Sequence, residues 1–144
     1  MDTAPTEAQL TRLLEAAVTV AANAYAPYSN FRVGAALLLA GEDAAIITGC
    51  NVENASFRLT TCAEQTAVAA AVAGHGPKIR ILAVAVANLN HAPSQPCGAC
   101  RQTLAEFSRP ETLILFPGPD GHTSRRLLSD LLPASFTLTT PEPT

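Results

Sequence analysis

The sequence carries little charge, and almost none of it comes from lysine. Charged residues make up 15% and aromatic residues 5% of the 144 residues, and Lys78 is the single lysine. A protein that tracks a nucleic-acid strand needs stripes of basic residues and aromatic platforms for the bases. Since the arginines are scattered and the formal net charge is -3, we expect no nucleic-acid partner and a small, neutral or weakly charged ligand.

Long hydrophobic segments are also absent. No uninterrupted apolar stretch is long enough to cross a bilayer, and the N-terminal sequence MDTAPTEAQL has no basic region followed by an apolar run. We therefore expect a cytoplasmic protein with no membrane partner. In that reducing compartment, cysteines are expected to bind metal or to react rather than to form disulfides. The chain has four of them, Cys50, Cys62, Cys97 and Cys100.

Hydrophobic residues, by contrast, make up 48% of the chain, which makes intrinsic disorder unexpected. A chain of this length can form a hydrophobic core without disulfides, so we expect a single domain over residues 1–144. The same composition favours extensive burial of surface, and we expect an oligomer.

Apolar patterns predict helices that alternate with strands. Helices are expected over residues 6–25, with Thr6 and Gln9 as a capping box, over 61–74, from the QPCGAC segment to about 107, and over 129–132. Strands are expected over residues 32–40, 44–51, 79–88 and 112–116, the first two as a hairpin. This order implies an α/β domain with a mixed sheet and helices on both faces. Arg125 and Arg126 are assigned to a solvated helix start or turn without a role.

The spacing of three cysteines indicates a metal site. Cys97 and Cys100 form a C-x-x-C sequence after Pro96, near the first turn of the helix that follows. Taken alone, this pair is also compatible with a redox pair or with half of a structural zinc knuckle. Cys62, at the start of another predicted helix, adds a third thiol. Three thiolates can hold one Zn²⁺ and leave the fourth tetrahedral position open for water, as catalytic zinc sites do.

A closed structural site with Cys50 as fourth ligand is the alternative. Cys50 ends a predicted strand, whereas structural knuckles usually take their ligands as two close pairs, so we expect Cys50 to be a buried packing residue. Glu64 separates the two interpretations more sharply, because a zinc hydrolase needs a base near the metal-bound water. The competing interpretation of Glu64 is a solvated glutamate that favours the helix dipole.

Four linked motifs carry a resemblance to a known family. C-A-E at residues 62–64, followed by P-C-x-x-C at 96–100, resembles the zinc-dependent cytidine deaminase superfamily. PYSNFRVGAAL, GCNVENASF, TCAEQTAV and QPCGACRQTLAEF resemble the small three-cysteine cytidine deaminases of free nucleosides, usually homotetramers, over about residues 25–136. The resemblance implies a three-layer α/β/α fold with a mixed, roughly five-stranded sheet.

The resemblance also implies an activity and a metal site. Cytidine and deoxycytidine would be hydrolysed to uridine and deoxyuridine plus ammonia, a step of pyrimidine salvage. Cys62, Cys97 and Cys100 would hold one Zn²⁺ per chain. Glu64 would take a proton from the zinc-bound water and deliver it to the pyrimidine N3 and then to the leaving amine.

Substrate-binding positions follow from the same resemblance. Asn51 and Glu53 would hold the ribose hydroxyls, and Phe31 would lie beside the nucleoside. The backbone N–H of Ala63 would contact the base carbonyl, and Phe136 would stack on the base in a neighbouring subunit. The full set implied by the resemblance is Phe31, Asn51, Glu53, Ala55, Ala63 and Phe136.

The residues themselves leave alternatives open. Asn51 and Glu53 could instead satisfy loop backbone groups, and Phe31 and Phe136 could be core residues. A noncatalytic zinc-stabilised module and a deaminase of antibiotics or modified cytidines are the competing functions, although the N-V-E-N sequence favours a ribose ligand.

Gln65 is the clear departure from the family pattern, which usually has arginine after the catalytic glutamate. We expect the Gln65 amide to donate a hydrogen bond to a ligand sulfur. The alternative is an exposed helix residue of good helix propensity.

Overall fold

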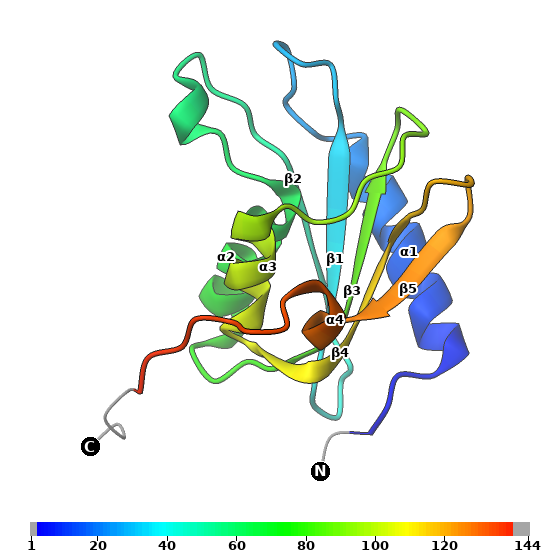
Figure 1. Cartoon of the computed structure of the whole chain (residues 1–144), viewed down its shortest axis with the longest axis vertical. Coiled ribbons are helices and arrows are strands. Elements are labelled where there is room, and N and C mark those ends of the chain that lie inside the picture. The colour runs from blue at the N-terminus through cyan, green and yellow to red at the C-terminus, as the bar shows by residue number, and fades with distance from the viewer. Residues whose placement is uncertain (1–2, 140–144) are drawn as a thin grey trace.

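The computed structural model describes residues 3–139 (Figure 1). The single domain expected over residues 1–144 therefore includes two short ends, residues 1–2 and 140–144, that lie outside the described residues. The helices are α1 (Glu7–Ala21), α2 (Ala63–His75), α3 (Gly98–Ala105) and α4 (Leu128–Leu131), with a 3-10 turn η1 (Phe57–Leu59). The strands are β1 (Val33–Leu39), β2 (Ile46–Cys50), β3 (Ile81–Asn88), β4 (Ser108–Pro117) and β5 (Thr123–Leu127).

The strands form one mixed five-stranded sheet in the order β2-β1-β3-β4-β5. The predicted hairpin is confirmed, because β1 and β2 pair antiparallel. Only the β3–β4 pair among these strands is parallel, and its crossover is made by α3, as parallel neighbours require. The remaining neighbours, β1 with β3 and β4 with β5, are antiparallel.

Helices cover both faces of the sheet, which confirms the three-layer α/β/α architecture. Figure 1 shows α1 on one side and α2 and α3 on the other. One core cluster joins α1 to the sheet, including Leu10, Leu13 and Ala36. The other joins α2, α3 and α4 to the opposite face. Strand β3 lies between the two clusters, which explains why its sequence, ILAVAVAN, is continuously apolar.

Two glycines let the helices α1 and α2 lie close to the sheet. A Cβ atom at Gly34 of β1 would overlap the backbone of Ala17 in α1. At Gly49 of β2, a Cβ atom would overlap the backbone N–H of Ala67 and lie 2.7 Å from the carbonyl oxygen of Ala63, both in α2. The missing side chain at Gly49 therefore sets how close the first turns of α2, which carry the candidate site, come to the sheet.

Helix ends follow local capping chemistry. The predicted capping box of α1 is confirmed: the Gln9 backbone N–H donates to the Thr6 hydroxyl at 3.1 Å, and the Thr6 backbone N–H donates to Gln9 Oε1 at 2.9 Å. The helix ends at Ala21 rather than near residue 25. The N–H of Asn23 donates to the Val20 carbonyl at 2.9 Å, an i−3 contact that tightens the backbone there.

The assignment of Arg125 and Arg126 to a helix start or turn is wrong. Both lie in the edge strand β5, opposite Leu115 and Ile114 of β4. The polar sequence TSRRL has no apolar alternation, as suits an edge strand that is almost wholly exposed. Arg125 also has a partner, because its guanidinium donates to both carboxylate oxygens of Glu7 in α1 at 2.9 and 3.0 Å.

None of the helices in residues 3–139 combines the length and the hydrophobicity that a membrane span requires.

Candidate active site

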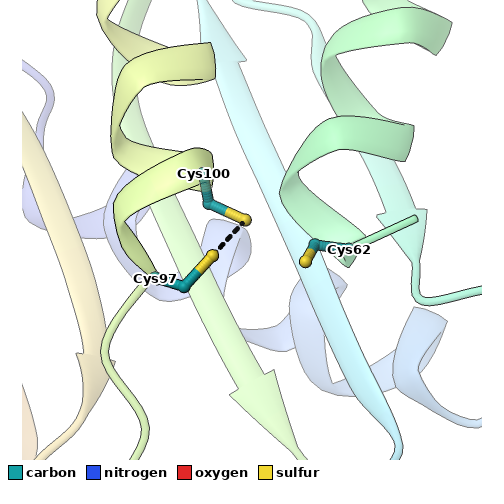
Figure 2. Close-up of side chains that lie close together, drawn as sticks. All are labelled: Cys62, Cys97 and Cys100. Atoms are coloured by element: carbon teal, nitrogen blue, oxygen red, sulfur yellow. Dashed lines mark hydrogen bonds between the residues drawn. The ribbon is translucent and has the colours of Figure 1, made fainter. Parts of the chain in front are cut away.

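Two helix N-termini bring three thiols together (Figure 2). Cys62 is the N-cap residue of α2, Cys97 is the N-cap residue of α3, and Cys100 lies in the first turn of α3. Their sulfur atoms all lie within 4.8 Å of one another. The Sγ atoms of Cys97 and Cys100 are 3.4 Å apart. The predicted placement of all three thiols at helix starts is confirmed.

The three sulfur atoms fit a zinc ion. With Zn–S bonds of about 2.3 Å, tetrahedral geometry separates two ligand sulfurs by about 3.8 Å. Small movements of these side chains therefore suffice for three Zn–S bonds. Cys50, at the end of β2, is half-buried and not buried as expected. It is not part of the group, which argues against a closed four-cysteine site. The positive ends of the α2 and α3 dipoles lie at the site and offset part of the negative charge of three thiolates.

The thiols influence one another's protonation. A hydrogen bond with Cys100 lowers the pKa of Cys62 to about 7. The same hydrogen bond, together with burial, raises the pKa of Cys100. Because zinc binds cysteine as the thiolate, binding of a metal to all three sulfur atoms would release the protons that the thiols still carry.

Glu64 lies in the first turn of α2 and is buried, with 4% of its surface exposed. Burial raises the pKa of its carboxyl group. A solvated first-turn glutamate would be exposed and would titrate normally, so this interpretation of Glu64 is wrong. A raised pKa makes this carboxyl group a better proton acceptor than an ordinary glutamate, which suits a residue that takes up and returns a proton in general acid–base catalysis.

The thiols and Glu64 line a cleft of about 320 Å³, together with polar side chains that include Ser29, Asn51 and Glu53. This volume falls in the range of about 300–1,000 Å³ typical of small-molecule sites. Four of the residues expected to bind substrate line it: Phe31, Asn51, Glu53 and Ala63. A second cavity, of about 340 Å³, lies beside the N-terminal segment and β4, and no cysteine or histidine is among its lining residues. The cleft with the three thiols is therefore the better candidate for a zinc site.

The side chain of Asn51 holds the backbone that leads into β1. Its Oδ1 accepts from the N–H of Val33 at 2.9 Å, and its Nδ2 donates to the carbonyl of Phe31 at 2.8 Å. Asn51 therefore fixes the position of Phe31 in the cleft wall, as the interpretation from the residues alone allowed. One N–H and one lone pair of the amide are not used by these bonds.

Glu53 is held in a similar way by the preceding loop. Its Oε1 accepts from the backbone N–H groups of Tyr28 at 2.9 Å and Ser29 at 3.2 Å, and its Oε2 accepts from the Ser29 hydroxyl. The Ser29 hydroxyl, followed by the two backbone N–H groups, lowers the pKa of Glu53 against the opposing effect of burial. The carboxylate is thus kept charged and oriented at the cleft wall.

Two of the expected substrate contacts lie elsewhere. Neither Ala55 nor Phe136 lines the cleft of its own chain. Phe136 is 68% exposed, so it is not a core residue, and its carbonyl accepts from Nε2 of Gln102 at 2.9 Å. The contact of Phe136 with substrate that the resemblance implies is therefore not formed within one chain.

Gln65 lies close to Cys62, a candidate zinc ligand, but makes a different bond from the one expected. Its Oε1 accepts from the backbone N–H of Cys62 at 3.1 Å. Among residues 3–139, the side-chain Nε2 of Gln65 donates no hydrogen bond to a sulfur atom. Gln65 thus fixes the backbone of Cys62 at the start of α2.

Sequence reasoning missed several residues of the cleft and its walls. Ser29, Ser94 and Gln95 line the cleft, and each stands in a motif segment or directly before one. Asn90 is also outside the prediction. Its Nδ2 donates to the carbonyl of Asn30 at 3.0 Å and its Oδ1 accepts from the N–H of Arg32 at 3.3 Å, so it holds the backbone on both sides of Phe31. No local pattern could have indicated these long-range contacts.

Comparisons with known proteins agree with this site. The sequence profile described as the cytidine and deoxycytidylate deaminase zinc-binding region matches residues 7–116. The chain is 42% identical over 125 residues to a cytidine deaminase of Halalkalibacterium halodurans, covering 87% of this chain and 92% of that protein. It is 45% identical over 122 residues to a cytidine deaminase of Mycobacterium tuberculosis, covering 85% of each.

Solved structures agree as well. The crystal structure of cytidine deaminase from Mycobacterium tuberculosis gives a TM-score of 0.78 at 42% identity, over 93% of this chain and all of that chain. Cytidine deaminase from Burkholderia pseudomallei also gives a TM-score of 0.78 at 42% identity, over 92% of this chain. Because the family match spans most of the chain and includes both helix starts that carry the thiols, the chain belongs to the zinc-binding family of cytidine and deoxycytidylate deaminases.

Proposed function

We propose that this protein hydrolyses free cytidine and deoxycytidine to uridine and deoxyuridine plus ammonia, as an enzyme of pyrimidine salvage. The observation that carries the proposal is the buried Glu64 carboxyl group beside three thiols in one small-molecule cleft. A noncatalytic zinc-stabilised module has no use for a buried carboxyl group with a raised pKa next to its metal, so we do not favour it.

The proposed chemistry divides between metal and protein. When bound by Cys62, Cys97 and Cys100, Zn²⁺ supplies a Lewis acid that brings the pKa of a bound water toward neutrality. Glu64 then accepts the proton of the attacking water and delivers it to N3 of the pyrimidine. Once the water oxygen is bonded to C4, the same carboxyl group would take the remaining proton of that oxygen and pass it to the amine, so that the C4–N4 bond breaks, ammonia leaves and the C4 carbonyl group of the product forms.

The cleft walls orient the nucleoside in this proposal. Phe31 lies beside the nucleoside, and the Ala63 backbone N–H, at the start of α2, donates to the base carbonyl. The Glu53 carboxylate accepts a hydrogen bond from one ribose hydroxyl, and the Asn51 side-chain amide donates one to another. Both use hydrogen-bonding groups that their contacts with the loop leave free. Both are already held in place before substrate arrives, so little conformational entropy is lost on binding.

A surface beside the cleft supports an oligomer. We define the mouth patch as the exposed side chains of Tyr25, Tyr28, Val52, Phe57 and Leu59. Backbone bridges join Tyr25 to Val52 and Val52 to Thr61, which lines the cleft, so the patch is continuous with the site. Exposed apolar side chains that gather in one place are typical of protein–protein interfaces. We propose a homotetramer in which Phe136, and the loop that carries Ala55, reach the active site of a neighbouring subunit.

We further propose that residues 1–144 form one domain and that the protein works in the cytoplasm. The single sheet, which contains every strand of residues 3–139, supports one domain. The need for three reduced cysteines at the metal supports a reducing compartment.

A spectrophotometric assay with cytidine, deoxycytidine and cytosine tests the function. We expect turnover of both nucleosides and little of cytosine, which lacks the ribose that Asn51 and Glu53 would hold. Glu64→Ala should keep one zinc per chain and lose activity by about 100- to 10,000-fold, the range typical of a general acid–base residue. Cys50→Ala is the matched control and should keep both zinc and activity.

Two outcomes would contradict the proposal. Zinc-loaded wild-type protein that leaves all three compounds unchanged would rule out this substrate class. A zinc-loaded Glu64→Ala protein with wild-type turnover would rule out the role of Glu64.

A further inference from the structure

Cys97 is the ligand whose position is least explained by packing. Its side chain is exposed, whereas Cys100 is fully buried and Cys62 is half-buried. An exposed ligand keeps its position only if the backbone turn that carries it is held from outside. Pro96, directly before Cys97, is fully buried and gives that turn one anchor.

Arg101 gives the turn a second anchor. Its Nε donates to the carbonyl oxygen of Pro96 at 2.8 Å, and its Nη1 donates to the carbonyl oxygen of Leu131 at 2.8 Å. Pro96 precedes the N-cap residue of α3, and Leu131 is the last residue of α4. Carbonyl groups at the end of a helix have no partner within the helix, so Leu131 needs an external donor.

The shape and charge of the guanidinium suit this double contact. Arginine presents its N–H donors in a planar, rigid fork, which fixes two acceptors relative to each other. Within residues 3–139, Arg101 forms no ion pair with a carboxylate. Its half-buried charge is therefore satisfied by the two carbonyl groups, and hydrogen bonds from a charged donor are stronger than neutral ones.

The next residue extends the same anchor. Gln102 donates through Nε2 to the carbonyl oxygen of Phe136 at 2.9 Å. Two consecutive residues of α3, directly after the ligand Cys100, thus hold the end of α4 and the segment that follows it. The turn that carries Cys97 and the segment that carries Phe136 are therefore both held by hydrogen bonds from α3.

We propose that Arg101 is a positioning residue for the zinc site: it holds the turn of Cys97 in the geometry that binds zinc and fixes this turn to the end of α4. The proposal rests on the zinc site of the proposed function but does not depend on which substrate is deaminated. It assigns to Arg101 a role in metal affinity that is separate from general stability.

Zinc affinity of the full-length protein tests the role. We compare wild type with Arg101→Ala, Arg101→Lys and the neighbouring control Gln102→Ala by competition with a chromogenic zinc chelator. Loss of contacts that orient a metal ligand typically weakens metal binding by about 10- to 100-fold, and we expect this loss for Arg101→Ala. Arg101→Lys, which cannot reach both carbonyl groups with one fork, should fall between Arg101→Ala and wild type. Gln102→Ala keeps the contact to Pro96 and should bind zinc as wild type does.

A second measurement separates positioning from simple stabilisation. The thermal midpoint is measured for each protein with and without zinc. If Arg101 acts on the metal site, the increase in Tm on adding zinc should be smaller in Arg101→Ala than in wild type. A merely structural role would lower both midpoints equally and leave the increase unchanged.

The outcomes are decisive in both directions. Zinc affinity equal to that of wild type in Arg101→Ala overturns the proposal. If Arg101→Ala does not fold, Arg101→Lys decides: weakened zinc binding supports the proposal and unchanged binding overturns it. Wild-type protein that binds zinc but deaminates no cytidine would contradict the proposed function and leave this test of Arg101 valid.

Discussion

Gln65 and Gln9 make the same contact at two different helix starts. Gln65 Oε1 accepts from the backbone N–H of Cys62 at 3.1 Å, and Gln9 Oε1 accepts from that of Thr6 at 2.9 Å. Only the first of these N-cap residues is a proposed zinc ligand. The pair therefore allows the capping effect of a glutamine to be separated from an effect on the metal.

We predict that Gln65→Ala and Gln9→Ala differ at the metal. Each loses one hydrogen bond, so each should lower the free energy of unfolding by about 0.5–1.5 kcal/mol, measured by urea denaturation. Gln65→Ala should in addition lower zinc affinity or turnover by about 10- to 100-fold, because it frees the backbone of a ligand. Equal zinc affinity and turnover in both variants would show that Gln65 is only a capping residue.

Glu53 leads to a prediction about pH. The Ser29 hydroxyl and two backbone N–H groups lower its pKa from 4.5. Because the folded pKa lies below the unfolded one, the stability that this carboxylate contributes is complete above the unfolded value and is lost as the pH falls through the folded value. Zinc-free protein should therefore lose stability below pH 4.5, and Glu53→Gln should show a smaller loss.

Circular dichroism during urea denaturation, at a series of pH values, measures this difference. Glu111→Gln is a suitable control, since it removes an exposed carboxylate outside the cleft. Identical pH dependence in wild type and Glu53→Gln would mean that the contacts of Glu53 with the loop do not stabilise its charged form.

At the scale of elements, the distance of α2 from the sheet depends on Gly49 in the neighbouring strand β2. The first turns of α2 approach β2 at Gly49, where a Cβ atom would overlap the backbone of Ala67. We predict that Gly49→Ala pushes α2 from the sheet at a cost of about 1–3 kcal/mol, typical of overpacking. Zinc affinity should fall as well, because Cys62 moves with α2. Both effects are measured on the purified protein by urea denaturation and chelator competition.

Gly74, near the end of the same helix, provides the control. A Cβ atom there meets nothing within 4 Å. Gly74→Ala should leave zinc affinity unchanged and should stabilise the helix by at most about 1 kcal/mol, the difference in helix propensity between the two residues. Wild-type stability and zinc binding in Gly49→Ala would show that α2 can shift without cost.

The sequence predicts those elements that are determined by local chemistry. The capping residues Thr6 and Gln9 and the C-x-x-C sequence after Pro96 indicate helix starts, and the apolar run of β3 indicates a central strand. Strand β5 was missed because its pairing with β4, and not its own pattern, makes it a strand. Likewise, the burial of Glu64 and the contacts of Asn51 with residues 31 and 33 depend on packing between distant segments.

At the scale of the molecule, the exposed mouth patch lies next to the candidate active-site cleft. Phe57 is 76% exposed, and its ring meets Tyr28 edge-on at a centroid distance of 6.0 Å. Phe136 is also exposed and is held by Gln102 away from its own cleft. These aromatic side chains are suited to contact another chain, which is why we propose that active sites are completed between subunits.

Complementation between two impaired variants tests this arrangement. Glu64→Ala lacks the proposed proton carrier, and Phe136→Ala lacks the proposed stacking side chain, but each retains the residue that the other has lost. In a mixed oligomer, the cleft of a Phe136→Ala chain contains Glu64 and can receive Phe136 from a Glu64→Ala neighbour. We predict that cytidine turnover in the mixture exceeds the sum of the two separate variants. Mixed oligomers are first verified by native mass spectrometry with one tagged chain.

The control for complementation is a mixture of Glu64→Ala with Cys100→Ala. Both substitutions affect the part of the site that lies within a single chain, because Glu64 and Cys100 line the same cleft. No mixed cleft of this pair regains both residues, so its activity should stay at the sum of the separate variants. Absence of recovery in verified mixtures of Glu64→Ala and Phe136→Ala would place the function of Phe136 outside the neighbouring active site. Recovery restricted to that pair would show that one cleft uses Glu64 of one subunit and Phe136 of another.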